Sequence, residues 1–145
     1  MTMAVLDATD QVMGRFASVV AKRLLNGEEI HVVNAERAIV TGGRAALIAE
    51  YLQKTHMGST ASRMRGKGPN YPRRPDRVLR RVIRGMIPYQ KPHGRTAFKR
   101  LRVYIGVPPE FEGKPVERVE EASRIGTARF LRLGELSERL GSRFT

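Results

Sequence analysis

The sequence contains no cysteine, and aromatic residues make up only 6% of its 145 residues. The absence of cysteine excludes disulfides, thiolate zinc sites and cysteine nucleophiles. No uninterrupted run of about 18 or more apolar residues occurs, so no transmembrane helix is expected. Residues Met1 to Val5 lack the basic start and long apolar core of a signal peptide. We therefore expect a cytoplasmic protein.

Acidic residues are scarce as well. The chain has 14 Asp and Glu residues against 27 Lys and Arg, which gives a net charge of +13. Its apolar share of 41% is ordinary for a globular protein, and its length suffices for one domain with a core. We expect a single domain, residues 1–145, that binds a polyanion and whose charge opposes homo-oligomerisation.

The excess positive charge is concentrated in about one third of the chain. Residues 56–105 hold 14 cations and a single acid, Asp76, whereas the other residues hold 13 cations and 13 acids. Arginine supplies 21 of the 27 cations, and its planar guanidinium binds phosphate through two parallel hydrogen bonds. A GC-rich genome would also raise the arginine content, but it would not gather the charge in one segment. Residues 56–105 are therefore predicted to bind nucleic acid.

The first third of the chain has the pattern of a parallel βαβ unit. Ala4–Leu6 and Glu29–Val33 are predicted strands, and an amphipathic helix is predicted between them from Gln11 onward. Asp10 is in a position to cap this helix, and Gly14 is expected to let it pack closely on the strand. The pattern favours an α/β fold.

Two further helices are predicted in the middle of the chain. Arg44 to Lys54 follows a short extended piece, Ala38–Thr41, and has apolar residues on one side. Residues 57–74 lack periodicity and are rich in Gly, Ser, Pro and Arg, which predicts a long loop that becomes ordered against a partner. The next helix is predicted to begin at Pro75 and to end before Pro88.

The helix that begins at Pro75 has two contrasting faces. Its predicted core side consists of Leu79, Val82, Ile83 and Met86. Its basic side consists of Arg77, Arg80, Arg81 and Arg84. Spacings of three and four place each set on one side of a helix, so the arginines are expected to face a partner. The alternative is that they pair with acids of the same chain.

The remaining residues complete the expected domain. The predicted elements are a basic helix at Gly94–Arg100, a strand at Leu101–Ile105, a helical segment at Val116–Ala122, a strand at Arg129–Leu133 and a helix at Glu135–Leu140. Residues 107–145 then form a C-terminal extension. Together these patterns indicate one α/β domain with a protruding basic loop and helix.

Catalytic and metal-binding motifs are missing. The three histidines have no metal-ligand spacing; His31 is expected in the core or at a strand edge, and His93 beside a phosphate or a base. Gly66-Lys67-Gly68 lacks the GxxxxGK(S/T) pattern, so it is not expected to bind a nucleoside triphosphate. We favour contact with RNA phosphates at this site over the alternative of a disordered hinge. Met13-Gly14-Arg15 stands where a dinucleotide-binding fold has its phosphate-binding turn, but it lacks the GxGxxG pattern of that turn. We expect no cofactor and no small-molecule substrate.

The basic segment also contains aromatic residues. Tyr71 lies in Asn70-Tyr71-Pro72-Arg73-Arg74, which combines a stacking surface with phosphate donors and suits folded or unstacked RNA. Phe98 and Tyr104 are expected to fill the core. Double-stranded DNA is a second candidate partner, but no helix-turn-helix or zinc finger is evident. A membrane surface is disfavoured because the basic helix lacks Trp or Phe anchors.

Several motifs resemble the ribosomal protein L-thirteen family. In the basic segment these are Arg73-Arg74-Pro75-Asp76-Arg77, Arg84-Gly85-Met86-Ile87-Pro88, Gly94-Arg95 and Phe98-Lys99-Arg100-Leu101-Arg102-Val103-Tyr104 with Gly106. Near the start they are Asp7, Met13-Gly14-Arg15, Ala17-Ser18, Val33-Asn34-Ala35-Glu36 and Thr41-Gly42. Ile87 stands where the family usually has leucine. The early strand and the tail after Gly106 are similar to the archaeal form.

The resemblance implies a three-layer α/β/α fold around a small, mainly parallel sheet. It also implies a protein of the large ribosomal subunit, within the cytoplasmic ribosome, that binds large-subunit rRNA beside neighbouring ribosomal proteins during early assembly, without catalysis. Charge and resemblance together give these candidate RNA-binding residues: Arg63, Arg65, Lys67, Arg73, Arg74, Arg77, Arg80, Arg81, Arg84, Lys91, His93, Arg95, Lys99 and Arg100. The alternatives are a free mRNA-binding regulator and a small α/β nucleotide-binding enzyme that uses the Met13-Gly14-Arg15 turn.

Overall fold

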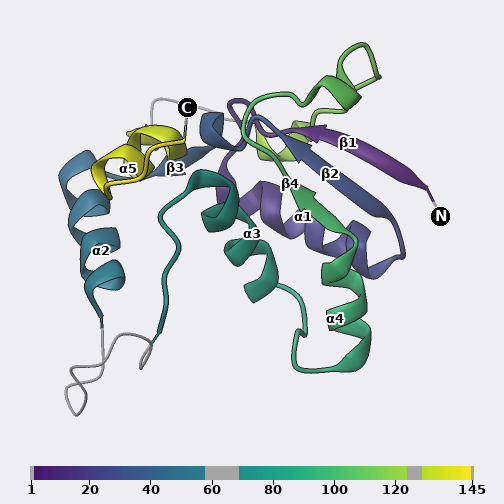
Figure 1. Cartoon of the computed structure of the whole chain (residues 1–145), viewed down its shortest axis with the longest axis horizontal. Helices are drawn as coiled ribbons and strands as arrows, with labels where there is room; N and C mark the ends of the chain where they lie inside the picture. Colours follow the sequence, from purple (N-terminus) through teal and green to yellow (C-terminus); the bar gives the residue numbers. More distant parts are fainter. Residues whose placement is uncertain (1, 58–68, 124–128, 145) are drawn as a thin grey trace.

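The computed structural model describes residues 2–57, 69–123 and 129–144. Its central sheet has three parallel strands in the order β1 (Met3–Asp7), β2 (Glu29–Val33) and β4 (Leu101–Val103). Helix α1 (Met13–Leu25) connects β1 to β2, and all three strands point the same way (Figure 1). The predicted parallel βαβ unit is confirmed.

The two faces of this sheet are covered by different layers. Leu6, Ile30, Val32 and Leu101 are fully buried in the main core, on the side of helices α1, α3 (Pro75–Gly85) and α4 (Pro92–Lys99). On the other side, Val5 and Val33 form a second cluster with Phe111 of the 3-10 helix η2 (Pro109–Phe111), and Tyr104 packs against it. The protein therefore has the predicted layered α/β fold around a small parallel sheet.

A second, antiparallel pair of strands joins distant parts of the chain. Strand β3 (Ile39–Thr41) pairs with β5 (Phe130–Arg132), which leads directly into α5 (Leu133–Arg139). Helix α2 (Arg44–His56) lies beside α5 (Figure 1). Leu133 and Leu136 of α5 are fully buried in the main core. The C-terminal residues are thus part of the folded body, and the strand and helix predicted there are confirmed.

Two predictions about the start of α1 are wrong. Asp10 does not cap the helix, because α1 begins only at Met13 and no side chain caps it. Asp10 instead has a left-handed backbone (φ 57°), and its carboxylate lies 2.9 Å from Nη1 of Arg132. Gly14 is exposed, and a Cβ atom built there would meet nothing within 4 Å. It lies on the solvent side of the first turn and does not serve close packing.

The segment predicted as helical at Val116–Ala122 is mostly extended. Only Glu120–Ala122 forms a 3-10 turn (η3). Glu117 pairs with the outer edge of β1: its N–H donates to Val5 O (2.9 Å), and its carbonyl accepts from Asp7 N–H (2.9 Å). The open backbone groups of an edge strand explain why this segment is extended.

The other elements predicted for the middle of the chain agree with the structure where these residues are described. Helix α2 covers the predicted Arg44–Lys54, and α4 begins two residues before the predicted Gly94. The predicted loop 57–74 lies partly outside the described residues, and residues 69–74 are irregular chain that leads into α3. None of the helices in the described ranges is long and apolar enough to span a bilayer.

Candidate nucleic-acid interface

Helix α3 separates an apolar side from a basic side, as the sequence predicts. Pro75 occupies its first turn, where a missing N–H costs no hydrogen bond, and Asp76 follows. Leu79 and Ile83 are fully buried, and Val82 is half-buried against the core. Met86 was predicted to be buried but is 42% exposed, because α3 ends at Gly85 and Met86 lies in the turn that follows. Val78 takes the fourth core position.

The basic side of α3, which we call the arginine face, consists of Arg77, Arg80, Arg81 and Arg84. Within the described residues none of the four forms an ion pair with an acid. Three of them lie over aromatic rings: the guanidinium carbon is 4.5 Å from the ring centre of Phe98 for Arg80, 4.3 Å from Tyr71 for Arg81 and 5.4 Å from Tyr89 for Arg84. Such stacking orients a guanidinium and leaves its charge unneutralised.

The chain before α3 is attached to this face. Nη1 of Arg81 donates to the carbonyl of Asn70 (2.8 Å), which ties residues 69–74 to the helix. Nε of Arg74 lies 3.5 Å from Oδ1 of Asp76, an ion pair that does not reach hydrogen-bond geometry. Arg73 is exposed. Asp76 therefore neutralises at most one of the neighbouring cations.

Helix α4 is locked against the turn that follows α3. Arg95 donates to the carbonyls of Tyr89 (Nε, 3.2 Å) and Gln90 (Nη2, 3.1 Å). A Cβ atom at Gly94 would lie 2.0 Å from the carbonyl oxygen of Pro88, so only glycine allows this approach. The turn and the helix thus form one rigid unit beside the arginine face. Lys91, His93 and Lys99 are exposed on it.

One predicted RNA-binding residue has a clear role in the fold. Nη2 of Arg100 donates to the carbonyl of Leu24 (2.7 Å) at the end of α1, and this carbonyl also accepts from Gly27 N–H (3.1 Å). Its Nε is buried without a hydrogen-bond partner in the described residues. Arg100 therefore connects α1 to β4. Arg63, Arg65 and Lys67 lie outside the described residues.

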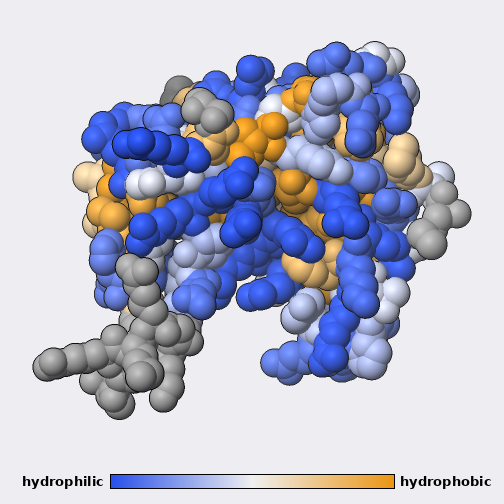
Figure 2. All heavy atoms as spheres, viewed as in Figure 1, coloured by the Kyte–Doolittle hydropathy of each residue, from blue (hydrophilic) through white to orange (hydrophobic). Residues whose placement is uncertain are grey.

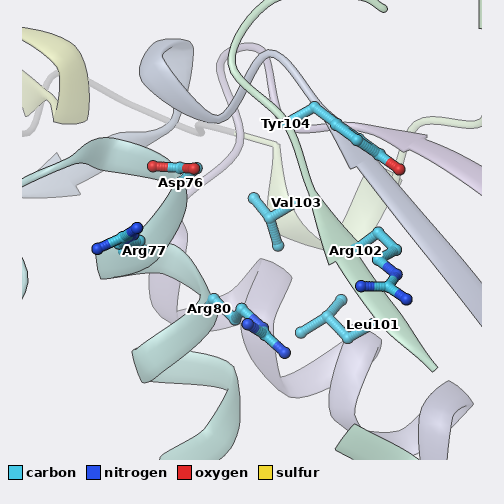
Figure 3. A pocket seen from close by; sticks show the side chains of 7 residues that line it. All are labelled: Asp76, Arg77, Arg80, Leu101, Arg102, Val103 and Tyr104. Carbon is cyan, nitrogen blue, oxygen red and sulfur yellow. The ribbon is translucent and has the colours of Figure 1, made fainter. Parts of the chain in front are cut away.

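Two adjoining grooves run along the arginine face. The first, of about 350 Å³, separates α3 from β4. Figure 3 shows Arg77 and Arg80 on its α3 side and Arg102 and Tyr104 on its β4 side, with Val103 between. The second, of about 330 Å³, is lined by Arg77, Arg80, Arg81, Arg84, Phe98 and Pro72. In Figure 2, hydrophilic residues cover the surface over α3 and α4.

Sequence reasoning left Arg102 out of the candidate site. This arginine is exposed and lines the first groove from β4. Its position in the alternating strand Leu101–Val103, between two core-facing residues, is the signal that could have identified it. The structure brings Arg102 and the arginine face together although they come from different elements.

The carboxylate of Asp7 at the end of β1 is held by hydrogen bonds within the fold. Asp7 accepts hydrogen bonds from Thr9 N–H (2.9 Å), Thr9 Oγ1 (2.6 Å) and Asn34 Nδ2 (3.1 Å). Burial alone would raise the pKa of Asp7, but these hydrogen bonds outweigh it and lower the pKa below 3.8. His31 is buried as expected and stacks on Tyr104. Among the described residues, no group of three or more His, Asp or Glu could hold a metal ion.

Comparison with known proteins gives a consistent result. The family model described as "Ribosomal protein L13" matches residues 1–110. The chain is 52% identical to the large ribosomal subunit protein uL13 of Methanopyrus kandleri over 94% of this chain and 86% of that protein. It is 46% identical to the protein of the same name from Methanosphaera stadtmanae, over 98% and 99% of the two chains.

A third relative, the large ribosomal subunit protein uL13 of Methanosarcina barkeri, is 44% identical over 98% of this chain and its own whole length. These relatives are archaeal, in agreement with the archaeal-type features of the sequence. The family model covers the central sheet and the arginine face, and the three relatives match over 94–98% of this chain. The chain therefore belongs to the ribosomal protein L13 family, whose members are structural, non-enzymatic proteins.

Proposed function

We propose that this chain is a structural constituent of the large ribosomal subunit, that it binds large-subunit rRNA through the arginine face, and that it helps early subunit assembly. It acts within the cytoplasmic ribosome, beside other large-subunit proteins. The observation that carries the proposal is the set of cations without acidic partners. Described residues 69–105 contain eleven cations and one acid, Asp76, which is paired with Arg74 alone.

The chemistry of this surface favours RNA over other polyanions. Guanidinium groups held over aromatic rings present their N–H donors in fixed directions, which suits the oxygens of phosphate. Arg77 and Arg80 line both grooves, so two adjacent stretches of backbone could share them. The ring of Tyr71 beside Arg81 adds a surface on which an unpaired base stacks, a feature of RNA recognition.

The proposal is tested by sedimentation and by salt titration. The chain, expressed in an archaeal host, should sediment with large-subunit particles rather than stay in the soluble fraction. Binding to large-subunit rRNA should weaken steeply with salt. If about 6–10 cations contact phosphate, the log–log slope should lie between about −4 and −9. A slope near zero, or a chain that stays soluble, would contradict the proposal.

A further inference from the structure

A third hollow, behind the arginine face, differs in chemistry from the two grooves. It lies between α2, the chain segment before α3, and α3 itself (Figure 1). Its volume is about 220 Å³. Its principal lining residues are Tyr51, Lys54, Tyr71, Val78, Arg81 and Val82. We call this hollow the tyrosine slot, and its interior is mainly apolar and aromatic.

A cationic side chain lies over the ring of each tyrosine that lines the slot. Nζ of Lys54 lies 5.0 Å from the ring centre of Tyr51, and the guanidinium carbon of Arg81 lies 4.3 Å from that of Tyr71. Both cations are held by further contacts: Lys54 by Glu50 (2.7 Å) and Arg81 by the carbonyl of Asn70 (2.8 Å). The hydrogen bond to Glu50 raises the pKa of Lys54, so it stays charged at neutral pH.

The open side of the slot needs a particular kind of occupant. An aliphatic side chain would satisfy Val78 and Val82 but would leave the positive charge of Arg81, which has no acidic partner among the described residues, without a counter-charge. A phosphate alone would leave the apolar walls without a partner. A nucleotide satisfies both, because a flat base stacks on tyrosine while its phosphate pairs with Arg81. Arg81 also lines the second groove, so RNA held there passes the mouth of the slot.

We infer that the tyrosine slot binds one unstacked RNA base, and that a phosphate next to this base contacts Arg81. This inference rests on the proposed function and sharpens it. It states that the RNA at this place has an unpaired nucleotide that is turned out of its helix. It also extends the interface to α2, which lies outside the basic segment 56–105 apart from His56.

Gly85 and Tyr71 allow the slot to be changed without removing a charge. Gly85 borders the slot, has no positive φ, and a Cβ atom there would meet nothing within 4 Å. Gly85→Leu therefore places bulk at the slot, and Gly14→Leu is its matched control on another helix with equal open space. Tyr71→Leu removes an aromatic wall but keeps apolar bulk. Tyr89→Leu is its control, because Tyr89 also lies beneath an arginine but does not line the slot.

The experiment measures the affinity of the full chain for two short RNA backbones at low salt. One strand is entirely abasic, and the other carries a single adenine at its centre. Wild-type protein should bind the adenine strand about tenfold more tightly, which is typical of one stacked base. Gly85→Leu and Tyr71→Leu should lose this gain, whereas Gly14→Leu and Tyr89→Leu should keep it. The two glycine variants should bind the abasic strand like wild type, and the two tyrosine variants should bind it equally to each other, because each frees one arginine from its ring.

The other outcomes are distinguishable. Equal, salt-dependent binding of both strands by wild type would overturn the base slot and leave the proposed function intact. A gain that persists in both slot variants would place the base elsewhere and also overturn the inference. Binding of neither strand would contradict the proposed function, and the base slot with it. An unchanged melting temperature for each variant confirms that folding is not the cause.

Discussion

Cations are held in two different ways in two regions of this molecule. Outside residues 69–105, several cations pair with carboxylates: Arg23 lies 2.7 Å from Glu28 and 2.9 Å from Glu117, and Arg132 lies 2.9 Å from Asp10. Within residues 69–105, Arg80, Arg81 and Arg84 of α3 rest on aromatic rings. Both arrangements fix a long side chain. Only the second keeps its full charge available to a polyanion, so a ring partner distinguishes the proposed binding arginines of α3 from the carboxylate-paired arginines that serve the fold.

The sharpest contrast should come from the buried side of α3. Leu79→Asp would place an unpaired charge where the side chain is fully buried, and the free energy of unfolding should fall by several kcal/mol, about 3 or more. Val82→Asp should cost less because Val82 is only half-buried. Thermal melting followed by circular dichroism measures both. If Leu79→Asp melted like wild type, the assignment of the core side would be wrong.

The next largest effect should come from Gly94. Gly94→Ala would bring a Cβ atom against the Pro88 carbonyl, so α4 and the preceding turn must separate, at a cost of about 1–3 kcal/mol. Gly85→Ala is the control, since its Cβ would have open space and should change stability by at most about 0.5 kcal/mol. Denaturant unfolding compares the two. Equal denaturation midpoints for the two variants would show that the turn before α4 adjusts to the added methyl group without loss of stability.

Two double variants compare the arginine classes directly. Arg80→Ala with Arg84→Ala should lower stability by no more than about 1–2 kcal/mol, the worth of two exposed cation–π contacts. It should weaken rRNA binding and make the salt slope shallower by about 1.4–1.8, because two phosphate contacts are lost.

Arg23→Ala with Arg132→Ala removes the same charge from carboxylate-paired positions. This control should leave the salt slope within about 0.5 of wild type, since the freed acids lie outside the arginine face. Melting curves and salt titrations of both double variants settle the comparison. A large loss of melting temperature with unchanged affinity in the Arg80 and Arg84 variant would show that these arginines serve the fold.

The smallest expected effect is on the stability of the fold at acidic pH. The pKa of Asp7 is lower in the folded than in the unfolded chain, so its hydrogen bonds stabilise the fold above pH 4 and are lost as the pH falls through the folded pKa. Asp7 is partly exposed, which limits the effect to about 1 kcal/mol. Asp7→Asn should flatten stability between pH 5 and pH 3, and unchanged acid sensitivity would argue against this role.

The sequence predicted what depends on local pattern. Periodicity identified β2, α1, α2 and α3, and the charge count identified the basic surface. Contacts between residues that are distant in the sequence could not be predicted from local pattern. Glu117 is extended because it pairs with the edge of β1, and Arg100 serves the fold because α1 ends beside it. Tyr51 was assigned only to an apolar helix side, since nothing local links it to Tyr71. Met86 was misplaced because a two-residue error in a helix end changes the direction of a side chain.

The pairing of β3 with β5 has a consequence for the order of events during synthesis. Residues 130–140 leave the ribosome after the whole arginine face has done so, yet they supply the partner of β3 and two fully buried leucines, Leu133 and Leu136. A nascent chain can therefore expose its cations while one strand edge is open and its core is incomplete. The body can therefore close only after translation has passed α5.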